Sequence, residues 1–158
     1  MNIIVTSGRG VGPTRVSAYD SALLDAGIGD FNLIELSSII PPASNIECDR
    51  FHCDPADIGK KLYVVLSRNG SEELSRTTYA GLGWAQSALS GAGVFVEDTG
   101  YCQKTLEASI NTSLDYMVDE RHWETVSDRG IVVKGITCTK SPVCVVVAAV
   151  FGMHCWQE

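Results

Sequence analysis

The chain has 158 residues, of which 45% are hydrophobic and 20% charged, enough to bury the core of one domain spanning residues 1–158. Its net charge of −7 repels phosphate backbones and argues against nucleic acid as a partner. No run of residues reaches the roughly 18 apolar positions that a membrane span needs, and the N-terminus lacks the pattern of a signal peptide. We therefore expect a cytoplasmic protein that binds neither nucleic acid nor a membrane.

The first part of the chain alternates between strand-like and helix-like patterns. A strand over residues 2–6 runs into a glycine-rich stretch, 8–13, which reads either as a flexible loop that closes over a ligand or as a plain turn. Small apolar residues share one face of a helix predicted over residues 17–26, and Gly27 is placed to end it. Residues 31–40 then read as one strand, which Pro41 and Pro42 end.

The rest of the chain begins with a polar stretch, 45–60, that reads as a surface excursion. The elements expected after it are a strand at 62–67, a helix of small residues at 78–89, a strand at 94–96, a long helix at 102–121, and strands at 131–137 and 143–151. The strand at 94–96 delivers Glu97 and Asp98 at its end.

This order of elements predicts an α+β layered sandwich, in which the helices cover the outer faces of the sheets. The doubly wound parallel sheet is the main alternative. It requires regular crossover connections, and two closing strands joined by the short segment Lys140-Ser141-Pro142 count against it.

The six cysteines show no paired CxxC spacing, so we expect reduced thiols rather than a disulfide framework. Cys48, His52 and Cys53 form a short cluster of residue types that bind metals. The cluster has no second half, and we therefore predict no metal site there.

Ser37 and Ser38 form the most informative pair in the sequence, because they lie at the end of an apolar run and just before two prolines. A serine hydroxyl can attack the carbonyl of the preceding residue and convert the amide into an ester, provided that the chain strains this bond. Elimination from the ester would leave dehydroalanine at position 38, which hydrolyses to a pyruvoyl group. The simpler reading is that the serines merely end a strand.

Several neighbouring segments support the first reading: Ala18-Tyr19-Asp20-Ser21-Ala22-Leu23-Leu24, Ala26-Gly27-Ile28-Gly29, Asn32-Leu33-Ile34 and Ser37-Ser38-Ile39-Ile40-Pro41-Pro42. Together they resemble the pyruvoyl-dependent arginine decarboxylases, and the resemblance resumes at residues 94–100. It implies cleavage between Ser37 and Ser38 into a small chain, 1–37, and a large chain, 38–158. It also implies a four-layer αββα sandwich with two central, mainly antiparallel sheets, and homotrimers or dimers of trimers with active sites between subunits.

The resemblance assigns a role to each matching residue. Ser38 becomes the covalent pyruvoyl cofactor, which forms a Schiff base with arginine and leads to agmatine and carbon dioxide. Glu97 matches the proton donor of the family, and Asn32 matches a residue implicated in self-processing. Asp20 matches the carboxylate that binds the guanidinium group through charge-assisted hydrogen bonds.

Two alternatives stay open from the sequence. The residues Thr14 to Ser17, just before Asp20, depart from the family pattern, so the same chemistry on histidine, aspartate or lysine is one alternative. The other is an unprocessed relative that only binds ligands. Against the second, Ser38, Glu97, Asp20 and Asn32 are all present, and a non-catalytic copy has no physical reason to keep all four.

Overall fold

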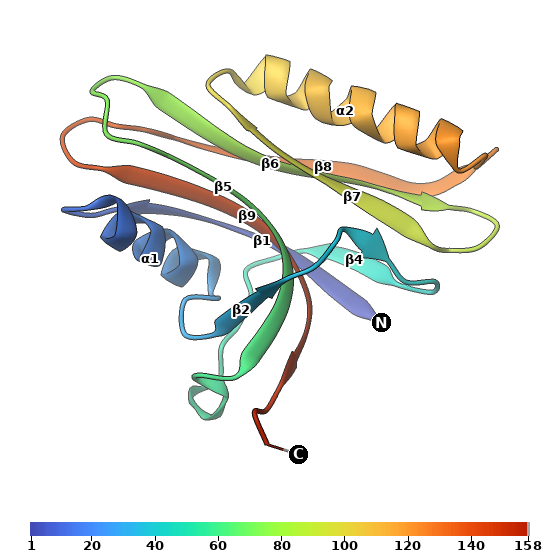
Figure 1. Cartoon of the computed structure of the whole chain (residues 1–158), viewed down its shortest axis with the longest axis horizontal. Helices are drawn as coiled ribbons and strands as arrows, with labels where there is room; N and C mark the ends of the chain where they lie inside the picture. Colours follow the sequence, from blue (N-terminus) through green and yellow to red (C-terminus); the bar gives the residue numbers. More distant parts are fainter. Residues whose placement is uncertain (158) are drawn as a thin grey trace.

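The computed structural model describes residues 1–157, which form two α-helices, one short 3-10 helix and nine strands (Figure 1). In chain order these are β1 (Asn2–Val11), α1 (Arg15–Ala26), β2 (Asn32–Glu35), β3 (Ile39–Ile40), β4 (Asn45–Cys48), η1 (Pro55–Asp57), β5 (Lys61–Ser71), β6 (Thr77–Ser87), β7 (Gly93–Gly100), α2 (Gln103–Glu120), β8 (Val126–Thr137) and β9 (Val143–His154). Within residues 1–157, no helix combines the length and the apolar character that crossing a membrane demands.

The strands form two sheets. Sheet A has the order β2-β5-β9-β1-β4, and sheet B has the order β3-β7-β6-β8. All pairs in sheet B are antiparallel, whereas sheet A combines two antiparallel pairs with the parallel pairs β1–β4 and β2–β5. The α+β class is thus confirmed. The two closing strands do not pair with each other, because β8 belongs to sheet B and β9 to sheet A.

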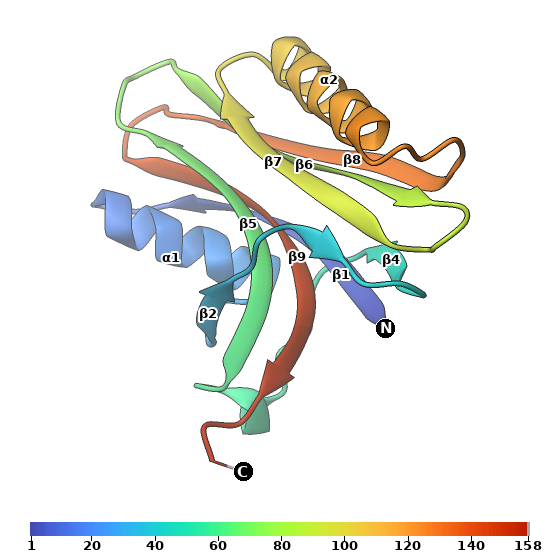
Figure 2. The same cartoon turned by 45° about the vertical axis from the view of Figure 1, so that its right-hand side comes forward.

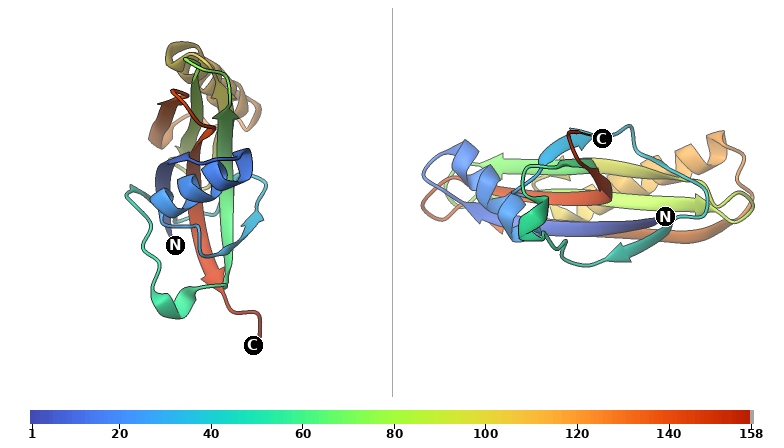
Figure 3. Two further views of the ribbon diagram at one scale, coloured as in Figure 1. Left: turned by 90° about the vertical axis from the view of Figure 1, so that its left-hand side faces the viewer. Right: turned by 90° about the horizontal axis from the view of Figure 1, so that it is seen from below.

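Three apolar clusters hold these elements together. The first joins α1 to sheet A through residues such as Ala22 and Val146, and the second fills the space between the sheets around Leu82 and Val147. The third joins sheet B to α2, with Ile110 fully buried. Figures 1 and 3 show α1 and α2 on opposite sides of the strands. Each helix therefore packs against one sheet, α1 against sheet A and α2 against sheet B.

The glycine-rich stretch at the N-terminus is not a ligand loop, because most of it belongs to β1. A side chain at Gly8 or Gly10 would collide with the backbone of α1 near Ala18 and Ala22. The glycines therefore allow the helix to lie close against the strand. Ala18, Ala22 and Ala26 are completely buried on the helix face that makes this contact. The prediction of a flexible loop or turn here was wrong.

The helix predicted over residues 78–89 was also wrong, because this segment is the central strand β6. Alternate residues of β6 face opposite sides: Leu82 packs between the sheets, while a side chain at Gly81 or Gly83 would collide with Ile110 on α2. Small residues led the sequence analysis to predict a helix in this segment. In the structure, Gly81 and Gly83 instead allow helix α2 to lie close to the strand.

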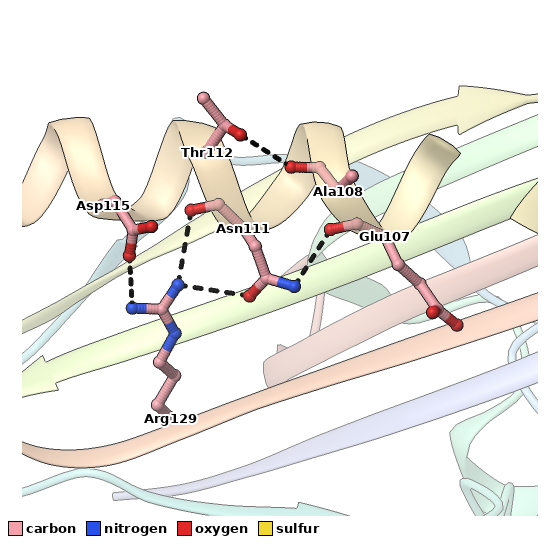
Figure 4. A network of polar contacts seen from close by, with 6 residues as sticks. All are labelled: Glu107, Ala108, Asn111, Thr112, Asp115 and Arg129. Carbon is pink, nitrogen blue, oxygen red and sulfur yellow. Dashed lines mark hydrogen bonds and ion pairs between the residues drawn. The ribbon is translucent and has the colours of Figure 1, made fainter. Parts of the chain in front are cut away.

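Helix α2 is fastened to the edge strand β8 by Arg129 (Figure 4). The guanidinium group donates to the carboxylate of Asp115 at 2.7 Å and to the side-chain oxygen of Asn111 at 3.1 Å. Arg129 also donates to the backbone carbonyl of Asn111 at 3.3 Å. These contacts hold α2 to the edge of sheet B through polar side chains on the exposed surface of the helix.

The strand predicted over residues 31–40 is divided between the two sheets. Its first part is β2, which pairs with β5 in sheet A, and its last part is β3, which pairs with β7 in sheet B. Residues 36–38 connect the two, and we call them the crossover. Figure 2 shows the chain leaving β2 and reaching β3 beside β7. Ser37 and Ser38 therefore lie between the sheets' edges rather than at the end of a strand.

Candidate active site

The crossover is held by one backbone hydrogen bond on each side of the Ser37–Ser38 peptide bond. The Leu36 N–H donates to the carbonyl of Val64 in sheet A at 2.8 Å. The carbonyl of Ser38 accepts from the Phe95 N–H in sheet B, also at 2.8 Å. The peptide bond between the serines therefore lies between one residue held by sheet A and one held by sheet B.

Ser38 has a left-handed backbone conformation, with φ of 60°. For an L-residue this conformation costs about 1–2 kcal/mol, because Cβ approaches the following carbonyl oxygen. Glycine is the residue that adopts it without this penalty. The structure therefore places backbone strain at the residue where the sequence predicts cleavage.

The hydroxyl of Ser38 points to Glu97. Its Oγ lies 2.9 Å from each of the two carboxylate oxygens, to which it donates. Glu97 is near the end of β7, opposite Leu82 of β6, and its side chain is exposed. A carboxylate this close can accept the hydroxyl proton, and a protonated carboxyl in the same place can return one.

Asn32 and Asp20 are not part of this contact. Asn32 begins β2, and its side-chain amide donates to the carbonyl of Gly59 at 2.7 Å. Asp20 is exposed on α1, which packs on the outer face of sheet A, and its carboxylate has no hydrogen bond or ion pair to any residue within 1–157. A single chain therefore brings together Ser38 and Glu97 and leaves the other two predicted site residues elsewhere.

A depression of about 510 Å³ lies along α1, lined by Tyr19 together with Arg68 and Tyr101. Asp20 is not among the residues that line it. The guanidinium group of Arg68 stacks over the ring of Tyr19, 4.9 Å from its centre. The hollow is wide enough for a ligand with a long side chain.

Cys48 and His52 are exposed, and Cys53 is partly buried. Among residues 1–157, no three His, Cys, Asp or Glu side chains are arranged to hold a metal ion. The site described above consists of oxygen groups of a serine and a glutamate, and its chemistry is that of proton transfer and acyl transfer.

Sequence reasoning missed the residues that hold the site in place. The Phe95 N–H fixes the Ser38 carbonyl, and no pattern in the sequence reveals a backbone donor of this kind. The same holds for Val64, whose backbone carbonyl accepts from the Leu36 N–H.

Comparison with known proteins identifies the family. A family model described as pyruvoyl-dependent arginine decarboxylase matches residues 2–155. Curated relatives with the same description include one from Pyrococcus furiosus, 32% identical over 148 residues, which are 93% of this chain and 92% of the relative. Another, from Thermococcus kodakarensis, is 36% identical over 115 residues, or 72% of this chain and 71% of the relative. A third, from Picrophilus torridus, is 28% identical over 88% of this chain and 82% of its own length. The resemblance inferred from the sequence is confirmed: the chain belongs to the family of pyruvoyl-dependent arginine decarboxylases.

Proposed function

We propose that the protein is a self-processing decarboxylase that converts L-arginine to agmatine and carbon dioxide with a pyruvoyl group made from Ser38. The observation that carries this proposal is the hydrogen bonding of the Ser38 hydroxyl to both oxygens of Glu97, at a strained residue in the crossover. Membership of the family supplies the substrate. The residues present fit a pyruvoyl group, since Ser38, its precursor, is already in contact with Glu97, a side chain that can take up and return a proton.

Self-processing begins at the Ser37–Ser38 peptide bond. Glu97 accepts the proton of the Ser38 hydroxyl, and the oxygen attacks the carbonyl carbon of Ser37. The C–N bond breaks as the C–O bond forms, so that Ser37 becomes an ester of the Ser38 side chain and the backbone nitrogen of residue 38 becomes an amine. Strain at Ser38 favours this step, because the bond to the left-handed residue is the one that breaks.

Loss of the α-proton of residue 38 then expels Ser37 as the carboxylate end of the small chain, 1–37. The dehydroalanine left at position 38 takes up water and releases ammonia, which leaves a ketone at the start of the large chain, 38–158. This ketone supplies an electrophile for the substrate amine and accepts the electrons released when carbon dioxide leaves.

Glu97 serves the decarboxylation as well. Its carboxyl group lies beside the residue that becomes the ketone, which is where the substrate carbon must be protonated after carbon dioxide has left. We therefore assign it the role of proton donor. Asn32, which matches the family residue implicated in self-processing, is proposed to assist this reaction from the start of β2, where its side-chain amide donates to the Gly59 carbonyl.

Asp20 is proposed to bind the substrate guanidinium from a neighbouring protomer. In one chain Asp20 lies over the outer face of sheet A, whereas Ser38 lies at the edge of the sandwich, and the Glu97 side chain is exposed there. A second copy that covers this edge would add Asp20 to the Ser38–Glu97 pair. This supports active sites shared between subunits of a trimer or of a dimer of trimers.

Two further parts of the prediction accompany this proposal. One apolar cluster joins α1 to sheet A, the second joins sheet A to sheet B, and the third joins sheet B to α2. This order supports the four-layer αββα sandwich. The cytoplasmic location, expected from the sequence, stays a prediction, as does the single domain over 1–158.

The proposal is tested by mass spectrometry of the purified protein after incubation. We expect two chains, 1–37 and 38–158, with the large chain lighter by the mass of one ammonia than a chain that begins with serine. Cyanoborohydride in the presence of arginine should then add the mass of the trapped substrate to the large chain, and agmatine should appear in an activity assay.

Activity assays of the same purified protein distinguish the alternatives. Activity on histidine, aspartate or lysine that equals or exceeds the activity on arginine would retain the pyruvoyl chemistry but refute arginine as the substrate. An intact chain that neither reacts with arginine nor releases carbon dioxide would identify an unprocessed, ligand-binding relative.

A further inference from the structure

The hollow along α1 is formed by four parts of the chain that meet at one end of the molecule. Figure 1 shows the start of α1, the end of β5 and the start of β9 at this end. Its volume of about 510 Å³ is that of a pocket for a small organic molecule. The residues that give it its chemistry are Tyr19 from α1, Arg68 from β5, Tyr101 after β7, and Val143 and Cys144 from β9.

The base of the hollow is apolar and its sides are aromatic. Val143 and Cys144 are only 4% and 6% exposed, so they close the hollow toward the core. Tyr19 packs partly against the first apolar cluster, and Tyr101 is exposed. A surface of this kind gains most from a ligand with an apolar body, which it can remove from water.

Arg68 supplies an unpaired cation to the hollow. Its guanidinium group stacks over the ring of Tyr19, 4.9 Å from the ring centre. Within residues 1–157 this group has no hydrogen-bond acceptor and no ion pair, whereas the guanidinium group of every other arginine has one or the other. Stacking covers a face of the planar group, and its N–H groups lie in the plane, where they are free to donate.

The hollow is locally positive on a chain whose net charge is −7. Among the described residues that line it, two are arginines and none is acidic. The second arginine, Arg15, is neutralised by Glu72, which lies 2.6 Å away. Asn69 also lines the hollow, but its amide nitrogen already donates to two backbone carbonyls. The group left to bind a ligand by charge is therefore Arg68.

We propose that this hollow is a binding site for a small organic carboxylate, with the acid group on Arg68 and the apolar body against Tyr19 and Tyr101. The two oxygens of a carboxylate match the fork of guanidinium N–H groups. Inorganic phosphate would meet the same cation but would leave the apolar and aromatic surface unused. Ser38, Glu97 and Asp20 do not line the hollow, so the site is additional to the proposed active site.

A matched control exists in Arg76. Its guanidinium group also stacks over an aromatic ring, that of Tyr101, 4.7 Å from the ring centre. It is paired with Glu73 at 2.8 Å, and Arg76 does not line the hollow. Arg68→Gln and Arg76→Gln each remove one exposed, stacked guanidinium group, but only the first removes the unpaired cation.

The experiment measures the binding of benzoate by ligand-observed NMR titration at low salt, because salt screens an exposed cation. For wild type we expect a Kd on the order of 1 mM, which is typical of a ligand with so few atoms. Arg68→Gln should weaken benzoate about 5- to 10-fold, and Arg76→Gln should leave its Kd within about twofold. Benzamide, which has the same shape without the charge, should bind wild type about 5- to 10-fold more weakly than benzoate.

Equal binding of benzamide and benzoate, or an unchanged Kd in Arg68→Gln, would overturn the role of the cation. Inorganic phosphate that binds as tightly as benzoate would overturn the organic class of ligand, and no binding of benzoate to wild type would overturn the site. Agmatine, a cation, should not displace benzoate; displacement would place the hollow within the active site and overturn its assignment as an additional one. These measurements need neither cleavage nor turnover, so an uncut wild-type protein would overturn the proposed function alone.

Discussion

Replacing Ser38 by alanine or by glycine separates the two properties of this residue, its hydroxyl and its strained backbone. Both variants lack Oγ, so neither should cleave, and both can be purified as intact chains. Only glycine adopts a φ of 60° without steric cost. The two variants therefore differ in the strain that we propose to assist the breaking of the Ser37–Ser38 bond.

The size of the difference follows from two opposing terms. The left-handed conformation costs alanine about 1–2 kcal/mol relative to glycine. Glycine loses more backbone entropy on folding, which returns roughly 0.5–1 kcal/mol. We expect Ser38→Gly to be more stable than Ser38→Ala by about 0.5–1 kcal/mol, which corresponds to a difference in Tm of about 1–4 °C for a chain of this length.

The difference in stability is measured by equilibrium unfolding in urea and by thermal unfolding. Both variants are measured at the same protein concentration, because association would add to their stability. Ala43→Gly is the matched control. Ala43 also has a left-handed backbone, with φ of 58°, and it has no part in the proposed chemistry, so the substitution should stabilise by a similar amount. If Ser38→Ala proved as stable as Ser38→Gly while Ala43→Gly gave the expected gain, the backbone at residue 38 would carry no strain.

Three further predictions concern single side chains. Glu97→Gln keeps an acceptor for the Ser38 hydroxyl but can neither take up nor return a proton, so self-cleavage should slow. In the chains that are cleaved, arginine should still be trapped by cyanoborohydride while agmatine formation per cleaved chain falls at least 100-fold, and near-normal turnover would refute the assigned donor. The Thr78 hydroxyl is fully buried and has no hydrogen-bond partner within residues 1–157, so Thr78→Val should raise the free energy of unfolding by about 1 kcal/mol, and a lower Tm would contradict this. The first turn of α2, chiefly the N–H and then the hydroxyl of Thr105, lowers the pKa of the Cys102 thiol and increases its thiolate fraction at neutral pH. Iodoacetamide should therefore label Cys102 before Cys155, which is also exposed, and peptide mapping checks this order.

The parts of the fold that the sequence predicts well are those with strong periodicity. The helix expected over 102–121 is α2, because its apolar residues repeat at three and four positions and face sheet B. The strand β6 was missed for the opposite reason. Its two faces carry small residues on one side and apolar residues on the other, and the glycines that accommodate α2 hide the alternation of a strand.

The candidate site was only partly accessible to sequence reasoning. Ser38 and Glu97 are 59 positions apart, and the structure brings them into contact because β3 and β7 are neighbours in sheet B. The division of residues 31–40 between two sheets could not be read from the sequence, since the run has one continuous apolar pattern. The placement of Asp20 and Asn32 away from Ser38 in one chain likewise depends on tertiary structure.

The position of the crossover is compatible with the proposed cleavage of the chain. Cleavage between residues 37 and 38 would separate β2 from β3, but the pairings of these two strands are with β5 and β7, so each would keep its own partner. The small chain also contains β1, which lies inside sheet A between β9 and β4, and α1, which is packed on it. These contacts should hold the small chain after the proposed cleavage. The new end of the large chain would stay attached through β3 to β7, the strand that carries Glu97, so the reactive group would form beside its proposed proton donor.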